Sequence, residues 1–244
     1  LLIECDDLLH RNMIYFLKAG DYDFLHGAIG NAFYFFNRFR CTKSDKLKSK
    51  YMNILLEFID LIEELSEKTE KDKLRWPSIL DRKKHVSGYN LSLSHGMASL
   101  LGFFNKLCEF NVFKHRVQPL LRYLINYILD LKKDDSITSC IFPSTILQDG
   151  NISYSGRVAW CYGDLGLAMC FWYSSKALKD KELEDLSLSM LKRVANRITF
   201  ESNKVIDAGM CHGSFGNAQI FNRMYKKTGE IIFKNASFVF ATAE

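Results

Sequence analysis

The sequence lacks an apolar run long enough to span a bilayer, and no signal peptide precedes its first element. The chain starts at Leu1 without a methionine, which fits a fragment, so the missing signal carries little weight. A dense basic stripe is also missing: the net charge is +5, and runs such as Lys46–Lys50 have acidic neighbours. This pattern is typical of a solvated surface and argues against nucleic acid, although an acidic peptide would suit the charge.

The seven cysteines form no regular disulfide framework and no Cys-x-x-Cys pair. A disulfide-stapled secreted domain would be smaller and richer in loops. The cysteines that lie in apolar or mixed sequence are therefore interpreted as reduced thiols, which places the chain in the cytoplasm. They are Cys5, Cys41, Cys108, Cys140 and Cys170.

Helical periodicity dominates what is present. The chain has 244 residues, 48% of them apolar and 25% charged, so it can bury one large core, and no linker divides it. We therefore expect a single domain over residues 1–244. Apolar residues recur at three- and four-residue steps over 47–65, 117–128 and 183–198, which predicts three helices with one buried face. Pro119 is expected in the first turn of the second helix.

Four segments with a Gly-x-x-Gly pattern lie among these helices, although one has Ser at the second glycine. They begin at His26, His95, Tyr162 and His212, and their first glycines are 69, 67 and 50 residues apart. An apolar run follows each segment, which indicates a buried helix entered through a tight turn. Alternating surface and buried helices predict two α-helical layers with the glycine turns at one end; an irregular bundle is the alternative.

Two polar stretches, residues 66–91 and 132–156, interrupt this plan. We predict that both are surface loops. Short strand pairing is expected at most around residues 137–142 and 146–147.

Histidine and cysteine concentrate at the glycine turns. Cys161, Cys211 and His212 would supply three ligands of a tetrahedral zinc site and leave its fourth position open, which is the catalytic pattern. From the spacing alone, inert cysteines near helix starts are the commoner interpretation.

Resemblance to a known family favours the zinc site. Trp160–Gly163 and Cys211–Gly213 look like the two zinc-bearing motifs of lanthionine synthetase C-like cyclases. Ser94–Gly96 resembles that family's histidine-glycine motif, and Asp23–Gly30 is similar to its aspartate-bearing glycine motif. Arg157 falls where the family has an arginine. The matches agree in order and approximate spacing over nearly the whole chain.

The resemblance implies an all-α fold, an α/α toroid with zinc held at one mouth by Cys161, Cys211 and His212. It implies further helical repeats before and after this segment, so the barrel is expected to be incomplete. It also implies an enzyme that adds a peptide cysteine thiolate to dehydroalanine or dehydrobutyrine and so closes thioether rings. The expected partners are a dehydrated precursor peptide, a separate dehydratase and an exporter.

The same resemblance suggests residues for the chemistry. His95 and Arg157 are candidates for stabilising and protonating the enolate, with Asp23 orienting or relaying and Tyr162 nearby. Each also has a purely structural interpretation. Asp23 would be a helix cap and His95 a core histidine, while Arg157 would form a surface ion pair and Tyr162 would pack as an aromatic. His26 matches no catalytic position of the family and is given no role.

Three other functions stay open. Eukaryotic relatives of the family add glutathione to dehydroamino acids. At the positions of Trp160–Gly163 they resemble Trp-Cys-His-Gly, and the tyrosine at 162 in this chain favours the bacterial peptide cyclases instead. A non-catalytic toroid could bind only zinc or peptide. A protein prenyltransferase subunit shares the architecture, but the Cys-His-Gly turn argues against it.

Overall fold

The computed structural model describes residues 2–81, 83–84, 86–133, 140–154, 156–199, 201 and 203–242. This part of the chain contains nine helices and six short strands. The helices are α1 (Leu2–Lys18), α2 (Ala28–Cys41), α3 (Asp45–Glu64), α4 (Met97–Leu107), α5 (Asn111–Asp130), α6 (Asp164–Leu178), α7 (Lys181–Ala195), α8 (Ser214–Thr228) and α9 (Ile231–Ala241). The strands are β1 (Glu67–Glu70), β2 (Lys73–Arg75), β3 (Ser78–Asp81), β4 (Val86–Asn90), β5 (Thr145–Leu147) and β6 (Ile152–Ser153).

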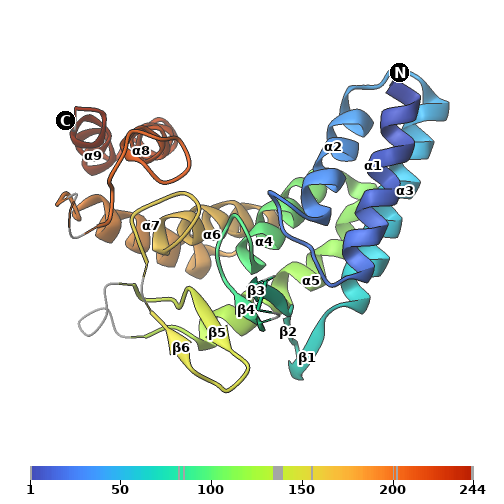
Figure 1. Cartoon of the computed structure of the whole chain (residues 1–244). Helices are drawn as coiled ribbons and strands as arrows, with labels where there is room; N and C mark the ends of the chain where they lie inside the picture. Colours follow the sequence, from blue (N-terminus) through green and yellow to red (C-terminus); the bar gives the residue numbers. More distant parts are fainter. Residues whose placement is uncertain are drawn as a thin grey trace.

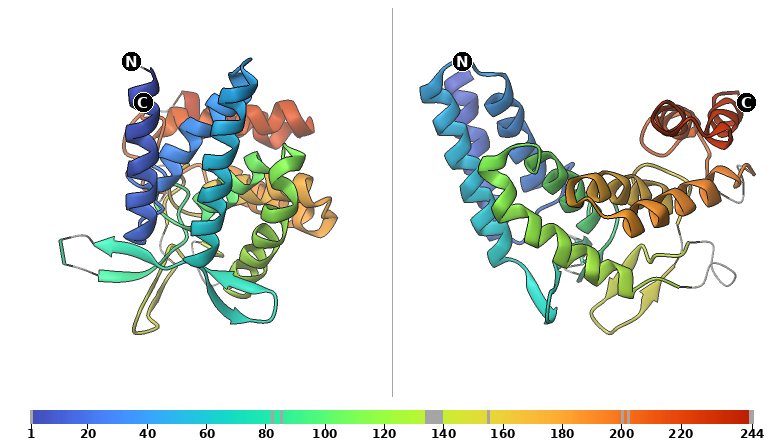
Figure 2. Two further views of the ribbon diagram at one scale, coloured as in Figure 1. Left: turned by 90° about the vertical axis from the view of Figure 1, so that its right-hand side faces the viewer. Right: turned by 180° about the vertical axis from the view of Figure 1, so that it is seen from behind.

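The helices follow one another around an open arc (Figure 1). Helices α1 to α3 form one limb, α4 to α7 the middle, and α8 and α9 the other limb, so the two chain ends lie at the two tips of the arc. The views in Figure 2 show the same arrangement from the side and from behind. None of the described helices is long and apolar enough to cross a membrane.

Two kinds of helix alternate along the arc. The glycine-turn helices, α2, α4, α6 and α8, each begin directly after one of the Gly-x-x-Gly turns, and α4 packs against both α2 and α6. The amphipathic helices α3, α5 and α7 pack against α2, α4 and α6 respectively. The three predicted amphipathic helices are therefore present. The terminal helices α1 and α9 were not predicted from the sequence.

The two kinds of helix also begin differently. Ser44 and Asp180 cap α3 and α7, where their side chains accept hydrogen bonds from the N–H groups of Leu47 and Leu183. The N-cap residue of every glycine-turn helix is a glycine, which has no side chain to accept such a bond. The glycine turn itself supplies backbone acceptors instead, as the carbonyl of Asp21 does for the N–H of Ala28 at 3.0 Å.

One close contact recurs in all four turns. A Cβ atom added to the first glycine of each turn would lie 2.0 to 2.6 Å from the backbone oxygen of the residue six positions earlier. These pairs are Gly27 with Asp21, Gly96 with Asn90, Gly163 with Arg157, and Gly213 with Asp207. Only a residue without Cβ can approach a carbonyl so closely, so each turn folds back on the segment before its helix. Gly163 also has φ +91°, which favours glycine on its own account.

Residues 66–91 and 132–156 were predicted to be surface loops, and this was wrong because both stretches contain β-strands. Strands β1 and β2 form a hairpin, and β3, β4, β5 and β6 form a four-stranded antiparallel sheet. Trp76 lies between the two sheets, is fully buried and donates its indole N–H to the carbonyl of Ile62 at 2.6 Å. Strands such as β1, with the polar sequence Glu-Lys-Thr-Glu, show no alternation of apolar residues that would predict them.

The expected strand pairing was partly right. Residues 146–147 lie in β5, whereas 137–139 lie outside the described residues and 140–142 form no strand. The buried carboxylate of Asp164 accepts the N–H groups of Ile141 and Phe142 instead, at 3.0 and 3.3 Å. These bonds attach this segment to the start of α6.

Pro119 was predicted in a first helical turn and lies inside α5 instead. The helix begins eight residues earlier, at Asn111. Phe113 explains the difference, because its ring is fully buried and packs against Phe39 at a centroid distance of 5.2 Å. This tertiary contact stabilises helical turns before residue 117, where the apolar periodicity begins.

Two substitutions in α4 and its turn test the close contact. Gly96→Ala should lower the free energy of unfolding by about 1–3 kcal/mol, because the new Cβ would meet the Asn90 carbonyl, and backbone cannot move aside cheaply. Gly102→Ala, six residues further along the chain and inside the helix, should be neutral or stabilising by up to about 1 kcal/mol, because alanine is the better helix former and its Cβ finds ordinary contacts. Urea denaturation measures both, and equal effects would show that the turn tolerates a side chain.

Candidate functional site

The four glycine turns contact one another, the last three through main-chain hydrogen bonds. The N–H of Leu93 donates to the carbonyl of Cys161 at 2.9 Å, and the N–H of Cys161 donates to the carbonyl of Cys211 at 3.3 Å. The ring of Phe24 in the first turn packs edge-to-face against Trp160 in the third, with centroids 6.2 Å apart. Residues from four distant segments are thereby held at one rim of the arc.

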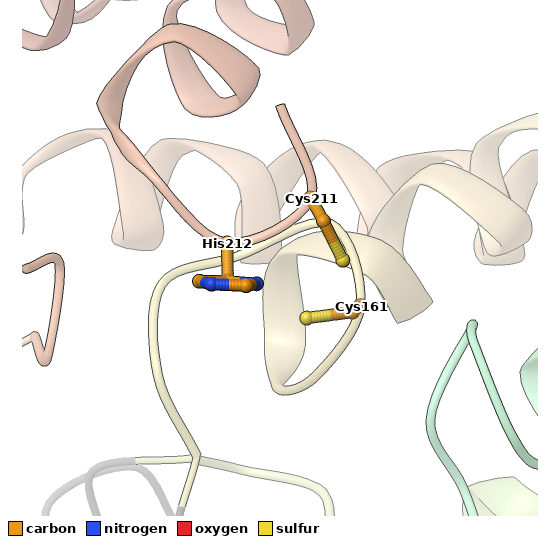
Figure 3. A group of neighbouring side chains, drawn as sticks. All are labelled: Cys161, Cys211 and His212. Atoms are coloured by element: carbon orange, nitrogen blue, oxygen red, sulfur yellow. The ribbon is translucent and has the colours of Figure 1, made fainter. Parts of the chain in front are cut away.

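Two thiols and an imidazole meet at this rim. Figure 3 shows that the sulfur atoms of Cys161 and Cys211 point toward each other and that the ring of His212 lies beside them. One donor atom from each residue lies within 4.8 Å of the other two. Both cysteines are free thiols, and Cys161 is buried. Thiolate sulfur and imidazole nitrogen are the donors that zinc prefers, so this set fits a metal ion.

The electrostatics of Cys161 also fit a bound cation. Burial and, after it, the neighbouring Cys211 thiol together raise the pKa of this thiol to about 12, while the positive charge of Arg157 opposes them. Burial also raises the pKa of Cys170, a thiol outside the cluster, to about 12. A raised thiol pKa is therefore not specific to the cluster of Cys161, Cys211 and His212. The adjacent second thiol distinguishes it, because two thiols this close become anionic together only beside a positive charge.

Asp23 and His95 form a second group at the same rim. One carboxylate oxygen of Asp23 lies 2.5 Å from Nδ1 of His95. The other oxygen accepts the backbone N–H groups of Leu25 and His26, at 2.6 and 2.9 Å. Asp23 therefore caps its own turn and binds the histidine of the next repeat. The alternative of a helix cap was wrong, because the N-cap of α2 is Gly27 and the Asp23 carboxylate binds the turn that precedes the helix.

Tyr162 and Arg157 each interact with a member of one of the two groups. The ring of Tyr162 faces that of His95 at a centroid distance of 6.1 Å, and its hydroxyl accepts a hydrogen bond from the side chain of Asn90 at 3.2 Å. Arg157 is half-buried, and its charge acts on Cys161. Each of the seven site residues predicted from the sequence is thus tied by a contact or a charge to one of the two groups.

His26 was given no role from the sequence, yet it belongs to the second group. Its ring lies parallel to that of His95, with centroids 5.5 Å apart and planes 4° from parallel. Its Nδ1 lies 3.7 Å from the carboxylate oxygen of Asp23 that His95 contacts. The repeat could have revealed this, because His26, His95, Tyr162 and His212 all directly precede the first glycine of their turns.

Asp23, His26 and His95 have the residue types of a metal site, and their donor atoms also lie within 4.8 Å of one another. Two ligands of one tetrahedral zinc ion would lie about 3.3 Å apart, given bonds of about 2.0 Å. The 2.5 Å between Asp23 and His95 is shorter than that and is a direct hydrogen-bond contact between the carboxylate and the imidazole. We therefore interpret this group as a proton-binding pair with a stacked second imidazole.

A cavity of about 790 Å³ has Cys211 among its lining residues. Residues of α4, α6 and α8 line it, together with Trp160 and Cys211. Its wall is mainly apolar, with Lys106, Lys176 and Arg223 among its charged residues. Its volume is in the range of ligand-binding pockets.

A family model described as "Lanthionine synthetase C-like protein" matches residues 2–242. The chain belongs to the lanthionine synthetase C-like family. Among solved structures it is similar to nisin cyclase, with a TM-score of 0.65 and 16% sequence identity. The match covers 91% of this chain and 55% of the nisin cyclase chain, so the chain spans little more than half the length of that protein.

The comparisons confirm two predictions from the sequence. The family is the one that the glycine-turn motifs resembled, and the fold is the helical toroid that this resemblance implied. The open arc in Figure 1 corresponds to the part of that toroid that this chain spans. The roles assigned to the individual site residues stay predictions.

Two substitutions separate the structural role of Asp23 from its contact with His95. Asp23→Ala should lower the free energy of unfolding by about 1 kcal/mol, because two backbone N–H groups lose their acceptor. Asp23→Asn should cost less, since its amide oxygen can still cap the turn. Thermal or urea denaturation measures both, and Asp149→Ala, which removes a comparable cap from Asn151 in the β5–β6 turn, is the matched control. A larger loss for Asn than for Ala would contradict the capping role.

Proposed function

We propose that this member of the lanthionine synthetase C-like family is a zinc-dependent peptide cyclase. It forms lanthionine or methyllanthionine rings by adding a peptide cysteine to dehydroalanine or dehydrobutyrine in the same dehydrated precursor. The observation that carries the proposal is the placement of two thiols and an imidazole beside an Asp–His pair and an apolar cavity. The printed name of the similar structure, nisin cyclase, agrees with this reaction class.

Cys161, Cys211 and His212 would hold the metal. Three protein ligands are the pattern of catalytic zinc sites, whereas structural sites use four. Bound zinc would supply a Lewis acid that keeps a substrate thiol deprotonated at neutral pH, where a free cysteine with a pKa of about 8.5 is mostly protonated. The positive charge of Arg157 also favours the thiolate form of Cys161.

The remaining residues act on the peptide. When the C–S bond forms at the β-carbon, the electron pair of the double bond moves toward the carbonyl and gives an enolate, which then takes a proton at Cα. His95, held by Asp23, is the proposed proton donor. The guanidinium of Arg157 and the hydroxyl of Tyr162 are the proposed groups that stabilise the enolate oxygen.

The proposed reaction defines the partners. It needs a peptide that a separate dehydratase has already treated, and an exporter would receive the product. The apolar cavity beside Cys211 is the proposed place for a segment of this peptide. The two cysteines must stay reduced to hold a metal, so the proposal fits a reducing compartment such as the cytoplasm.

Metal content tests the first part of the proposal. The chain should bind one zinc ion, and Cys161→Ala or Cys211→Ala should release it, because two remaining ligands hold zinc far more weakly. Metal analysis of the purified proteins measures this. Cys108→Ala and Cys170→Ala are matched controls that remove thiols outside the cluster and should keep the metal. Full retention in both ligand variants would rule out the site.

Cyclisation tests the second part. With a peptide that carries one cysteine and one dehydroalanine, the zinc-loaded chain should consume the thiol without changing the peptide mass, because the addition is an isomerisation. Mass spectrometry after treatment with a thiol-alkylating reagent measures both. His95→Ala and Asp23→Asn should keep zinc and lower the rate about 100-fold or more, the usual contribution of a positioned proton donor.

Three outcomes would contradict the proposed cyclisation. An unchanged level of alkylation with zinc-loaded protein would indicate a binding module. A mass increase of one glutathione, when glutathione is supplied, would indicate the reaction of the eukaryotic relatives. Loss of zinc from His95→Ala would show that His95 is a metal ligand.

A further inference from the structure

Asp207 lies beside the imidazole of His212 and has no role in the proposed reaction. One of its carboxylate oxygens is 3.1 Å from Nε2 of His212. Both side chains are about 40% exposed, at 41% for Asp207 and 43% for His212, so burial does not hold them together. The geometry of the turn must therefore explain why they meet.

The turn fixes the Asp207 carboxylate from two sides. Its second oxygen accepts the backbone N–H of Gly209 at 2.6 Å. The same oxygen would lie 2.2 Å from a Cβ placed on Gly213, so the absence of a side chain at Gly213 leaves room for it. The backbone carbonyl of Asp207 accepts the N–H of Ser214, the first residue of α8, at 2.9 Å. The carboxylate is thus positioned before any metal binds.

The position of Asp207 in the repeat points the same way. Asp207 is the residue six positions before the first glycine of its turn, and its counterparts in the other turns are Asp21, Asn90 and Arg157. His212 precedes the same glycine directly. The close contact between Gly213 and Asp207 therefore brings the carboxylate to the histidine of its own turn.

We propose that Asp207 is a positioning residue that fixes His212 for metal binding by accepting the proton on Nε2. Nδ1 then carries the lone pair and is the nitrogen presented to the metal. A neutral imidazole has one protonated and one free nitrogen, and a carboxylate beside one of them selects which. Carboxylate partners of this kind orient histidine ligands and typically change metal affinity 10- to 100-fold. The inference rests on the proposed zinc site.

Asparagine at this position gives a sharp test. In Asp207→Asn the amide oxygen is needed as the acceptor for Gly209, so the NH₂ group turns toward Nε2 of His212. An NH₂ group donates and favours a lone pair on Nε2, which moves the imidazole proton to Nδ1. The variant should therefore present the wrong tautomer to the metal, although it keeps the shape of the side chain.

The experiment measures zinc affinity by competition with a chromogenic chelator, on the whole chain and without substrate. Asp207→Asn should bind zinc about 10- to 100-fold more weakly than the wild type. The matched control is Asp149→Asn, which alters a carboxylate that accepts the N–H of Asn151 two residues later, as Asp207 does with Gly209. The control should change affinity less than twofold, and circular dichroism checks that both variants fold.

A second measurement needs no variant. Nitrogen-15 NMR of the zinc-loaded wild type should show His212 protonated at Nε2 and metal-bound at Nδ1. Binding through Nε2, or unchanged zinc affinity in a folded Asp207→Asn protein, would overturn the inference while Cys161→Ala still releases zinc and the proposed site stands. Failure of the wild type to bind zinc would overturn the proposed site and, with it, the role of Asp207.

Discussion

The close approach of each turn glycine to a carbonyl six residues earlier is the contact on which the rest of the structure depends. It folds the segment before each glycine-turn helix back onto the helix start, and it does so at four places in the chain. Backbone carbonyls then accept helix N–H groups that side-chain caps accept in α3 and α7. Because backbone geometry sets this contact, the residues around it are free to vary in chemistry.

This freedom explains how one repeated turn builds a site with several functions. The residue directly before the first glycine is histidine in the first, second and fourth turns and tyrosine in the third. Adjacent turns bring these side chains into ring contact, as with His26 and His95 and with His95 and Tyr162. The preceding position carries Cys161 and Cys211 in the last two turns. Equivalent backbone positions thus provide thiols at one end of the rim and imidazoles beside them.

Charge divides the rim into two groups of different character. Cys161 is buried beside a second thiol, and its raised pKa leaves it neutral unless a cation compensates. Asp23 instead holds His95 by a direct hydrogen-bond contact between its carboxylate and Nδ1 of the imidazole. The first group suits a metal and the second suits proton transfer, and the main-chain bonds between the turns hold them next to each other. A cyclase of the proposed kind needs both functions at one place.

The sequence alone determined the family, the helical class and the seven candidate residues, because these follow from local patterns: apolar periodicity, the Gly-x-x-Gly turns and the motifs around them. It did not predict α1, α9 or the strands between α3 and α4, and the polar sequence of β1 shows no apolar alternation that would have predicted a strand. It placed Pro119 wrongly, because the buried ring of Phe113 extends α5 through a tertiary contact. The contacts of His26 with His95 and of Asp207 with His212 form because the glycine turns fold back and bring these residues together. Only the tertiary structure decided these contacts, since side-chain directions at a turn depend on the close backbone approach that forms it.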